Sequence, residues 1–260
     1  MNETNSSDGD ILYDIEQRYG RTFDVHGNRE LAAMSPALRR LLRAGYITRM
    51  SRGVYTIAAR QELVIDDPLR AATAPFADIP HYVSWRAALS RHGLTEMDPL
   101  TISVALRCRR PKRKVSDLTV RPVYQSADRF YGFAATPTPY GSSVFVATPE
   151  KAIIDSLDRP DLAGGLAETV KALGRTHAYD AATLVTTALR FPSAATAARL
   201  GFLMTALGIG NPTPLRGRVR SHSAPVVLDL EDQGSASPID QTWRVADNVG
   251  TDILTQWASR

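Results

Sequence analysis

The sequence predicts an α+β protein in two parts, with a small N-terminal unit of three helices and a hairpin, followed by a larger mixed α/β domain with a small sheet and several helices. Three helical patterns precede two short β-prone runs within the first sixty residues, and β-prone runs then alternate with helical patterns. We expect a disordered tail at 1–9, the small unit at 10–62, a connector at 63–80 and the larger domain at 81–260.

The small unit begins with two helical patterns. "DILYDIEQRYG" has apolar spacing for a helix from Asp10 to Tyr19, and "NRELAAM" predicts another from Asn28 to Met34. A third helix starts at Ser35, whose oxygen can cap free N–H groups, with proline at the next position, and Gly45 ends it. "YITRM" and "GVYTI" then read as a hairpin. Three helices followed by a hairpin are the order of a winged helix-turn-helix.

The third helix and the hairpin carry bases and no acids from residue 35 to residue 57. At about 100° per residue, the leucines of the third helix share one side and its arginines the other. In a winged helix-turn-helix, that helix enters the DNA major groove and the hairpin tip contacts the backbone or the minor groove. We predict DNA contacts by Arg39, Arg40, Arg43, Arg49 and Arg52. Solvated surface arginines are the alternative. Ser35 could also donate to a phosphate, although capping explains it.

A second basic cluster lies in the larger domain. "RCRRPKRK" separates the β-prone runs "LTISVAL" and "LTVRPVY", which predicts a basic loop. Such a loop can grip phosphates and extend a DNA footprint, or it can be a solvated surface loop. The candidate contacts in this loop are Arg107, Arg109, Arg110, Lys112, Arg113 and Lys114.

The rest of the larger domain reads as scaffold. "YVSWRAALSRHGL" predicts a helix from Trp85 to His92, and Thr148 is placed to cap a helix in "TPEKAIIDSL". Further helices are expected at 166–173 and 181–189 and in "SAATAARLGFLMTALG". We interpret the aromatic residues of "YQSADRFYGF" as local packing, with RNA stacking as the alternative.

Composition limits the function. The net charge is +4 and the pI near 9.3, with the bases in blocks, which favours a polyanion partner. The lone cysteine and scattered histidines predict neither a disulfide nor a metal site, and no cofactor is expected. Gly141 and Ser142 lack the neighbouring carboxylates of a nucleotidyltransferase, so we expect no enzyme. The sequence has no apolar run long enough for a membrane span, and we expect a cytoplasmic protein.

Four segments carry a resemblance to a known family. "LRRLLRAGYITRMSRGVYTI", "YVSWRAALSRHGL", "VFVATPEKAIIDSL" and "ARLGFLMTALG" are similar, in the same order, to segments of the AbiEi family, which are antitoxins of type IV toxin–antitoxin systems. The resemblance covers roughly residues 10–210. "TFDVHGNREL" departs from it, because family members show a clearer apolar pattern in the second helix.

The resemblance implies a DNA-binding antitoxin that represses its own operon through inverted repeats. It implies that residues 81–260 form the antitoxin domain, and that the partners are promoter DNA and a nucleotidyltransferase-like toxin opposed without a stable complex. A nucleoid-associated protein is then expected. The alternatives are a general nucleic-acid-binding module for DNA or RNA and a protein-interaction module without sequence-specific repression.

Overall fold

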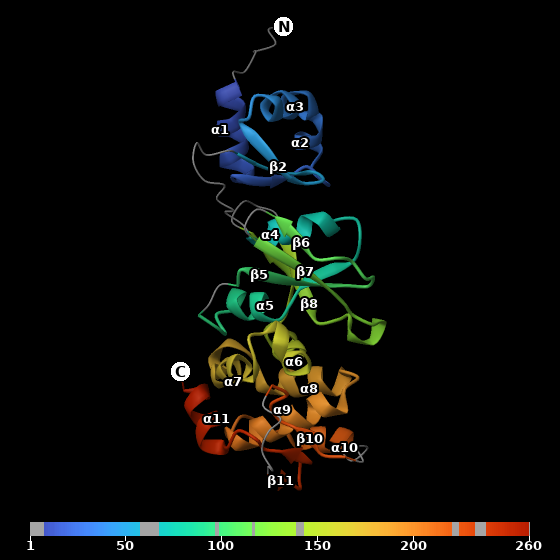
Figure 1. The fold of residues 1–260 in the computed structure, drawn as a ribbon, viewed down its shortest axis with the longest axis vertical. Coiled ribbons are helices and arrows are strands. Elements are labelled where there is room, and N and C mark those ends of the chain that lie inside the picture. Colours follow the sequence, from blue (N-terminus) through green and yellow to red (C-terminus); the bar gives the residue numbers. More distant parts are fainter. Residues whose placement is uncertain are drawn as a thin grey trace. The chain divides into compact units, whose positions relative to one another are not determined.

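The computed structural model describes residues 8–57, 68–96, 99–115, 118–138, 143–219, 224–231 and 238–259 (Figure 1). Helices and small sheets alternate along the chain, which confirms the predicted α+β class. The chain divides into two compact units, Met1–Tyr82 with Leu100–Tyr124 and Ala135–Phe145, and Val83–Pro99 with Gln125–Ala134 and Val146–Arg260. This division differs from the predicted boundary, because most of the central sheet groups with the N-terminal elements.

The N-terminal elements follow the order expected of a winged helix-turn-helix, with one further strand after the first helix. They are α1 (Asp8–Tyr19), β1 (Thr22–Asp24), α2 (Arg29–Ala33), α3 (Ser35–Arg43), β2 (Ile47–Ser51) and β3 (Val54–Ile57). The strands make an antiparallel sheet in the order β1-β3-β2. The core that holds the helices on this sheet consists of Ile15, Phe23, Leu31, Leu38, Leu41 and Ile47.

Two details of this unit correct the sequence prediction. Helix α1 begins at Asp8, so the last two residues of the predicted tail are helical; residues 1–7 lie outside the described residues. Acids at Asp8 and Asp10 suit the first turn of a helix, where the backbone N–H groups are positive. Strand β1 was not predicted, because three residues are too few to show alternation.

The predicted connector at 63–80 is partly a packed element. From Pro68 the chain forms α4 (Pro68–Thr73) and the 3₁₀ turn η1 (Ala74–Phe76), and residues 58–67 lie outside the description. Ala71, Ala72 and Phe76 are buried, and α4 contacts strands β5 (Thr101–Leu106) and β7 (Leu118–Tyr124). Pro68 begins α4 and Pro75 lies within η1, so these prolines belong to packed elements rather than to a linker.

Within the described residues, the strands of the central sheet have the order β6-β7-β5-β4-β9-β8. Besides β5 and β7 these are β4 (His81–Val83), β6 (Arg113–Val115), β8 (Phe133–Pro137) and β9 (Ser143–Ala147). Strands β5 and β7 are parallel, whereas β6 folds back antiparallel on β7 as the edge strand.

The helical unit is built around α6 (Pro149–Asp158), which contacts α5, α7, α8 and α9. The predicted cap is confirmed, since Thr148 accepts a hydrogen bond from the backbone of Lys151. The other helices and 3₁₀ turns are α5 (Arg86–Arg91), η2 (Ala127–Arg129), η3 (Pro160–Leu162), α7 (Leu166–Gly174), η4 (Thr176–Ala178), α8 (Ala181–Arg190), α9 (Ala194–Ala206), η5 (Thr213–Leu215), α10 (Arg216–Val219) and α11 (Thr251–Ala258).

A small C-terminal sheet packs on α9. Its strands are β10 (Val226–Val227), β11 (Ile239–Asp240) and β12 (Val245–Ala246), in the order β10-β12-β11. The ring of Trp243 lies so close to Gly201 that a Cβ there would meet it at 2.3 Å, and its Nε1 donates to Thr205 Oγ1 at 2.9 Å. The C-terminal segment is therefore packed closely against α9 within this unit.

Candidate nucleic-acid interface

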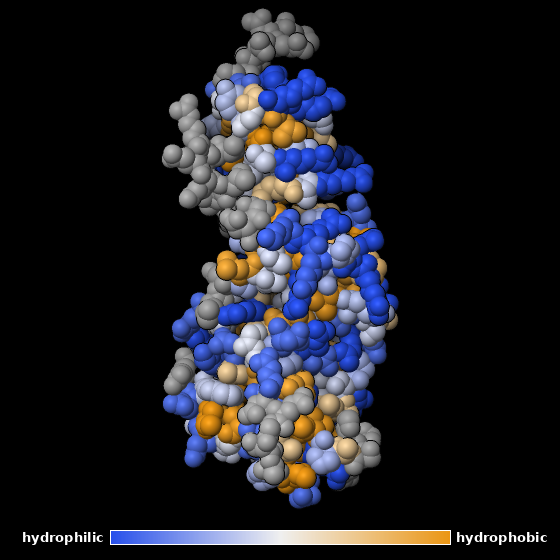
Figure 2. All heavy atoms as spheres, in the orientation of Figure 1, coloured by the Kyte–Doolittle hydropathy of each residue, from blue (hydrophilic) through white to orange (hydrophobic). Residues whose placement is uncertain are grey.

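Helix α3 has one buried face and one basic face. Leu38 and Leu41 are buried in the core of the winged helix, while Arg39, Arg40 and Arg43 are exposed. Hydrophilic residues gather where α3 lies, beside a hydrophobic area (Figures 1 and 2). The structure therefore brings the three predicted α3 arginines together on one surface, which we call the α3 face.

Ser35 does not play the capping role that the sequence predicted. The residue that precedes α3 is Met34, which makes no side-chain cap, and Ser35 is the first residue of the helix. Its Oγ donates to the backbone oxygen of Ala32 at 2.5 Å, at the end of α2. The reason is that only Met34 separates α2 from α3, so the hydroxyl lies beside the preceding helix. The side chain that caps a helix here is Asn28, which accepts from the backbone of α2.

Arg40 differs from its two neighbours because it is paired within the unit. Its Nη2 lies 2.6 Å from Oδ1 of Asp8, and its Nε donates to the same oxygen at 2.7 Å. Both side chains remain partly exposed, at 54% for Arg40 and 31% for Asp8. An exposed ion pair of this kind contributes at most about 1 kcal/mol, so a phosphate can compete for the guanidinium.

We expect Asp8→Asn to raise affinity for any DNA duplex, by up to about fivefold, because Arg40 is then released toward phosphate. The slope of log affinity against log salt should steepen by up to about 0.9, the value for one added phosphate contact. Fluorescence anisotropy across a salt series measures both. Asp14→Asn is the matched control, since Asp14 pairs with Arg18 on α1 itself at 2.8 Å. Weaker binding by Asp8→Asn would show that Asp8 positions Arg40 for DNA.

The hairpin β2–β3 supplies the two other predicted contacts of this unit. Arg49 and Arg52 are exposed, and Arg49 Nε donates to the backbone oxygen of Ser51 at 3.2 Å. The turn depends on Gly53, which has a φ of +78°. Its α-carbon faces the ring of His26, which is fixed by a 2.8 Å contact between Nδ1 and Asp24 Oδ1. The tip of the wing therefore packs closely against the β1–α2 loop.

Gly53→Ala should destabilise the protein by about 1–3 kcal/mol, because it adds left-handed strain and a Cβ only 2.0 Å from His26 Cε1. Urea unfolding measures the change in the free energy of unfolding. Gly45→Ala is the matched control: Gly45 has a φ of +76°, yet an added Cβ would meet nothing within 4 Å. Gly45→Ala should therefore cost less. Equal destabilisation by the two substitutions would contradict the close packing against His26.

The second basic cluster is only partly the loop that the sequence predicted. Arg107, Arg109, Arg110 and Lys112 lie on the β5–β6 connection, but Arg113 and Lys114 belong to strand β6. The residues "RKV" pair with β7, which extends the sheet by one strand. The Arg113 guanidinium lies over the ring of Phe76 at 5.8 Å. We call these six residues the basic edge; all six are exposed.

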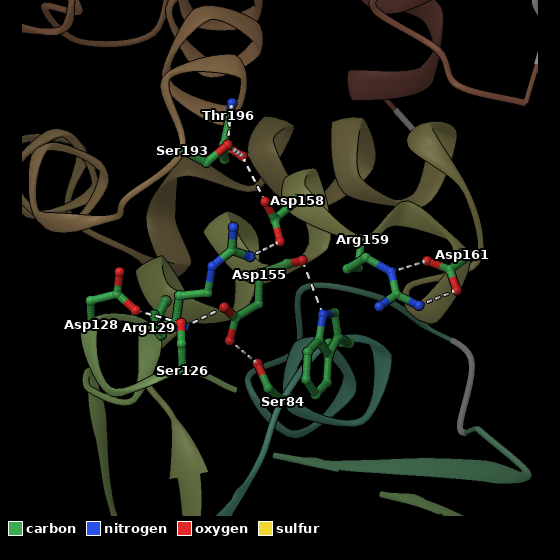
Figure 3. A network of polar contacts seen from close by, with 12 residues as sticks. Ser84, Ser126, Asp128, Arg129, Asp155, Asp158, Arg159, Asp161, Ser193 and Thr196 are labelled. Atoms are coloured by element: carbon green, nitrogen blue, oxygen red, sulfur yellow. Dashed lines mark hydrogen bonds and ion pairs between the residues drawn. The ribbon is translucent and has the colours of Figure 1, made fainter. Parts of the chain in front are cut away.

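A buried ion pair on α6 was not predicted from the sequence. The Nζ of Lys151 pairs with Oδ1 of Asp155, and both side chains are fully buried. Oδ2 of Asp155 accepts from Ser84 Oγ at 2.7 Å, and its backbone oxygen accepts from Trp85 Nε1 at 3.0 Å (Figure 3). Burial raises the pKa of the Asp155 carboxyl and lowers the pKa of the Lys151 ammonium, while their mutual attraction opposes both shifts. These bonds fasten α6 to the start of α5.

Trp85 has a strained backbone at this position. Its φ of 57° lies in a region that residues other than glycine rarely adopt. The indole is completely buried and hydrogen-bonded to α6, so its surroundings maintain the strained conformation.

A second cluster of polar contacts joins α6 to its neighbours. Arg129, at the end of η2, pairs with Oδ2 of Asp158, and its guanidinium lies over the ring of Phe191 at 4.8 Å. Oδ1 of Asp158 accepts from Thr196 Oγ1, which also contacts Ser193 at the start of α9 (Figure 3). Both aspartates of α6 are thus paired with cations, and their contacts stabilise the helical unit.

The aromatic cluster of "YQSADRFYGF" is divided between packing and the surface. Tyr131 is buried and donates to the backbone oxygen of Thr187 at 2.8 Å, and the rings of Phe130 and Phe133 contact each other edge to face. Tyr124 is half exposed. Most of the cluster therefore serves as local packing.

Comparison with known proteins gives one informative result. No family model matches the chain, and no curated protein matches it. The fold, however, has a solved counterpart. The crystal structure of the RV2827C protein from Mycobacterium tuberculosis superposes with a TM-score of 0.60 at 17% identity, over 87% of this chain and 83% of that one. At this identity the likeness concerns the fold alone.

Two other classes of feature are absent from the described part of the chain. It contains no group of three or more histidine, cysteine, aspartate or glutamate side chains that could hold a metal ion. Within the same residues no helix has the length and hydropathy to cross a bilayer.

Proposed function

We propose that the protein binds double-stranded DNA through α3 and the β2–β3 wing, and represses transcription of its own operon. The observation that carries this proposal is the α3 face, on which three exposed arginines stand on the helix that follows the turn of a winged helix-turn-helix. Arg49 and Arg52 on the wing are suited to backbone phosphates, because arginine forms two parallel hydrogen bonds with them.

The antitoxin role rests on the resemblance to the AbiEi family. In this proposal the operon also encodes a nucleotidyltransferase-like toxin, and the protein opposes it without forming a stable complex. The protein acts in the cytoplasm, associated with the nucleoid through its operator. Expression of the adjacent gene with and without this chain tests the antitoxin role. Cells that express the adjacent gene alone should stop growing, and cells that also express this chain should grow.

A promoter reporter tests repression. The region upstream of the gene is fused to a reporter, and the full chain is supplied from a second plasmid. We expect expression to fall about tenfold or more with the wild-type chain and to remain high with Arg39→Ala and Arg43→Ala combined. Equal expression with and without the wild-type chain would overturn the proposal.

The basic edge favours a second, less specific mode of binding. Six exposed bases on the edge strand β6 and on the connection that leads to it can follow a phosphate backbone of DNA or RNA whatever its sequence. If this mode alone operated, the protein would be a general nucleic-acid-binding module, and the reporter would show no promoter preference.

We expect Lys112→Ala with Lys114→Ala to lower affinity for all duplexes alike. The salt slope should flatten by about 0.9 for each phosphate that these lysines no longer bind. Arg113 is left in place because it packs over Phe76. Arg91→Ala with Arg216→Ala removes the same charge from exposed positions elsewhere and serves as the control. Unchanged affinity and slope in the Lys112/Lys114 variant would show that the basic edge is a solvated surface.

A further inference from the structure

Fewer side chains of α3 are available to bind a ligand than the charge of the helix suggests. The exposed residues of helix α3 are Ser35, Pro36, Arg39, Arg40 and Arg43. Proline offers no donor, and the Ser35 hydroxyl is already bonded to the end of α2. Arg40 is held by Asp8 on α1. The α3 face therefore leaves two long side chains for an external ligand.

Those two side chains are Arg39 and Arg43. Neither makes a hydrogen bond or ion pair with another residue in the described part of the chain. They are four positions apart, so they lie on one ridge of the helix, about 40° apart around its axis and about 6 Å apart along it. That spacing corresponds to about two base-pair steps, at roughly 3.4 Å each.

Base recognition follows from which donors and acceptors are present. Arginine pairs bidentately with O6 and N7 of guanine in the major groove, whereas adenine is read by asparagine or glutamine and cytosine by a carboxylate. From residue 35 to residue 57 the chain contains no asparagine, glutamine, aspartate or glutamate. Helix α3 therefore carries the side chains that recognise guanine and lacks the amide and carboxylate side chains that recognise adenine and cytosine.

We propose that the operator carries two guanines about two base pairs apart, read in the major groove by Arg39 and Arg43. This inference rests on the proposed DNA-binding function and adds the bases that it selects. Arg40 is held toward α1 by Asp8 and takes no part in reading bases. The arginines of the wing add affinity without selecting bases.

Selection from a random duplex library by the full-length protein, followed by sequencing, tests the proposal. The enriched motif should contain the guanine pair. Arg39→Ala should lose the preference at one guanine and Arg43→Ala at the other. Arg52→Ala on the wing is the control, and should weaken binding to every duplex while leaving the motif unchanged. An enriched motif without the guanine pair, or the same motif from all variants, would overturn the assignment.

Two further measurements separate base reading from charge and from misfolding. Arg39→Lys keeps the charge but loses the planar, rigid pair of donors, so it should weaken discrimination at its guanine while the salt slope stays unchanged. Replacing that guanine by 7-deazaguanine removes the N7 acceptor, so the affinity of the wild-type protein should fall about tenfold. The variant that already lacks the arginine reading that guanine should bind the two duplexes equally. Enrichment of other bases would refute the guanine pair alone, whereas no enrichment of any duplex would refute the DNA-binding function with it.

Discussion

Removal of Arg39 and Arg43 together is expected to abolish specific DNA binding while the fold is retained. Each bidentate arginine–guanine contact is worth about 1–3 kcal/mol, so affinity for the operator should fall roughly thirtyfold or more. Both side chains are exposed on α3, so the core residues Leu38 and Leu41 are undisturbed. Anisotropy with an operator duplex measures the fall in affinity, and circular dichroism verifies the fold.

The control for this variant again combines Arg91→Ala and Arg216→Ala, which remove equal charge from exposed positions outside the winged helix. This control should weaken binding only slightly and should do so for every sequence. An equal fall in affinity for the two variants would show that net charge, and not the α3 face, governs recognition.

Replacement of Asp155 by alanine is expected to cost about 3–5 kcal/mol of the free energy of unfolding. The variant leaves the Lys151 ammonium buried without its carboxylate, and an uncompensated buried charge is strongly unfavourable. It also removes the acceptor of Ser84 Oγ. Urea denaturation, followed by circular dichroism of the helices, measures the change.

A matched exposed pair lies nearby in the sequence. Arg159 contacts Asp161 at 2.8 Å, with both side chains about half exposed. Asp161→Ala should therefore cost no more than about 1 kcal/mol. A cost below about 1 kcal/mol for Asp155→Ala as well would mean that the buried pair contributes no more than a surface one.

The parts of the fold that could be predicted are those encoded by local patterns. The leucines and arginines of α3 are spaced so that they fall on opposite sides of a helix. Gly53 marks the turn of the wing between two β-prone runs. The cap at Thr148 followed from the Thr-Pro pair. Each of these signals lies within a few residues of the structure that it specifies.

The parts that could not be predicted depend on distant partners. Asp8 and Arg40 are 32 positions apart, and nothing local shows that an acid of the predicted tail reaches the third helix. Ser35 resembled a cap because serine followed by proline is a common helix start, whereas its bond to Ala32 depends on how closely α2 and α3 join. Lys151 and Asp155 have the spacing of an ordinary exposed pair. The signal that could have placed them inside is the apolar run from Ala152 to Ile154 between them, in a helix whose every side is covered.

The exposed arginines of α3 could be predicted because their signal is local, whereas the buried network could not be predicted because its partners are distant in the sequence. Exposed arginines on an amphipathic helix stand out in the sequence, because their neighbours on the helix are leucines. Partners across a core do not stand out, since any of several elements could supply them. The strained Trp85 illustrates this, because its indole donates to the backbone oxygen of Asp155, 70 positions away in the sequence.

Direct binding to the DNA upstream of the gene tests the central claim most directly. Fluorescence anisotropy should compare that duplex with a shuffled duplex of the same composition, at physiological salt and across a salt series. We predict preference for the upstream duplex of about a hundredfold or more, which disappears with Arg39→Ala and Arg43→Ala combined. Equal, salt-sensitive binding to both duplexes by the wild-type protein would contradict sequence-specific recognition, and no binding to either would contradict the DNA-binding function itself.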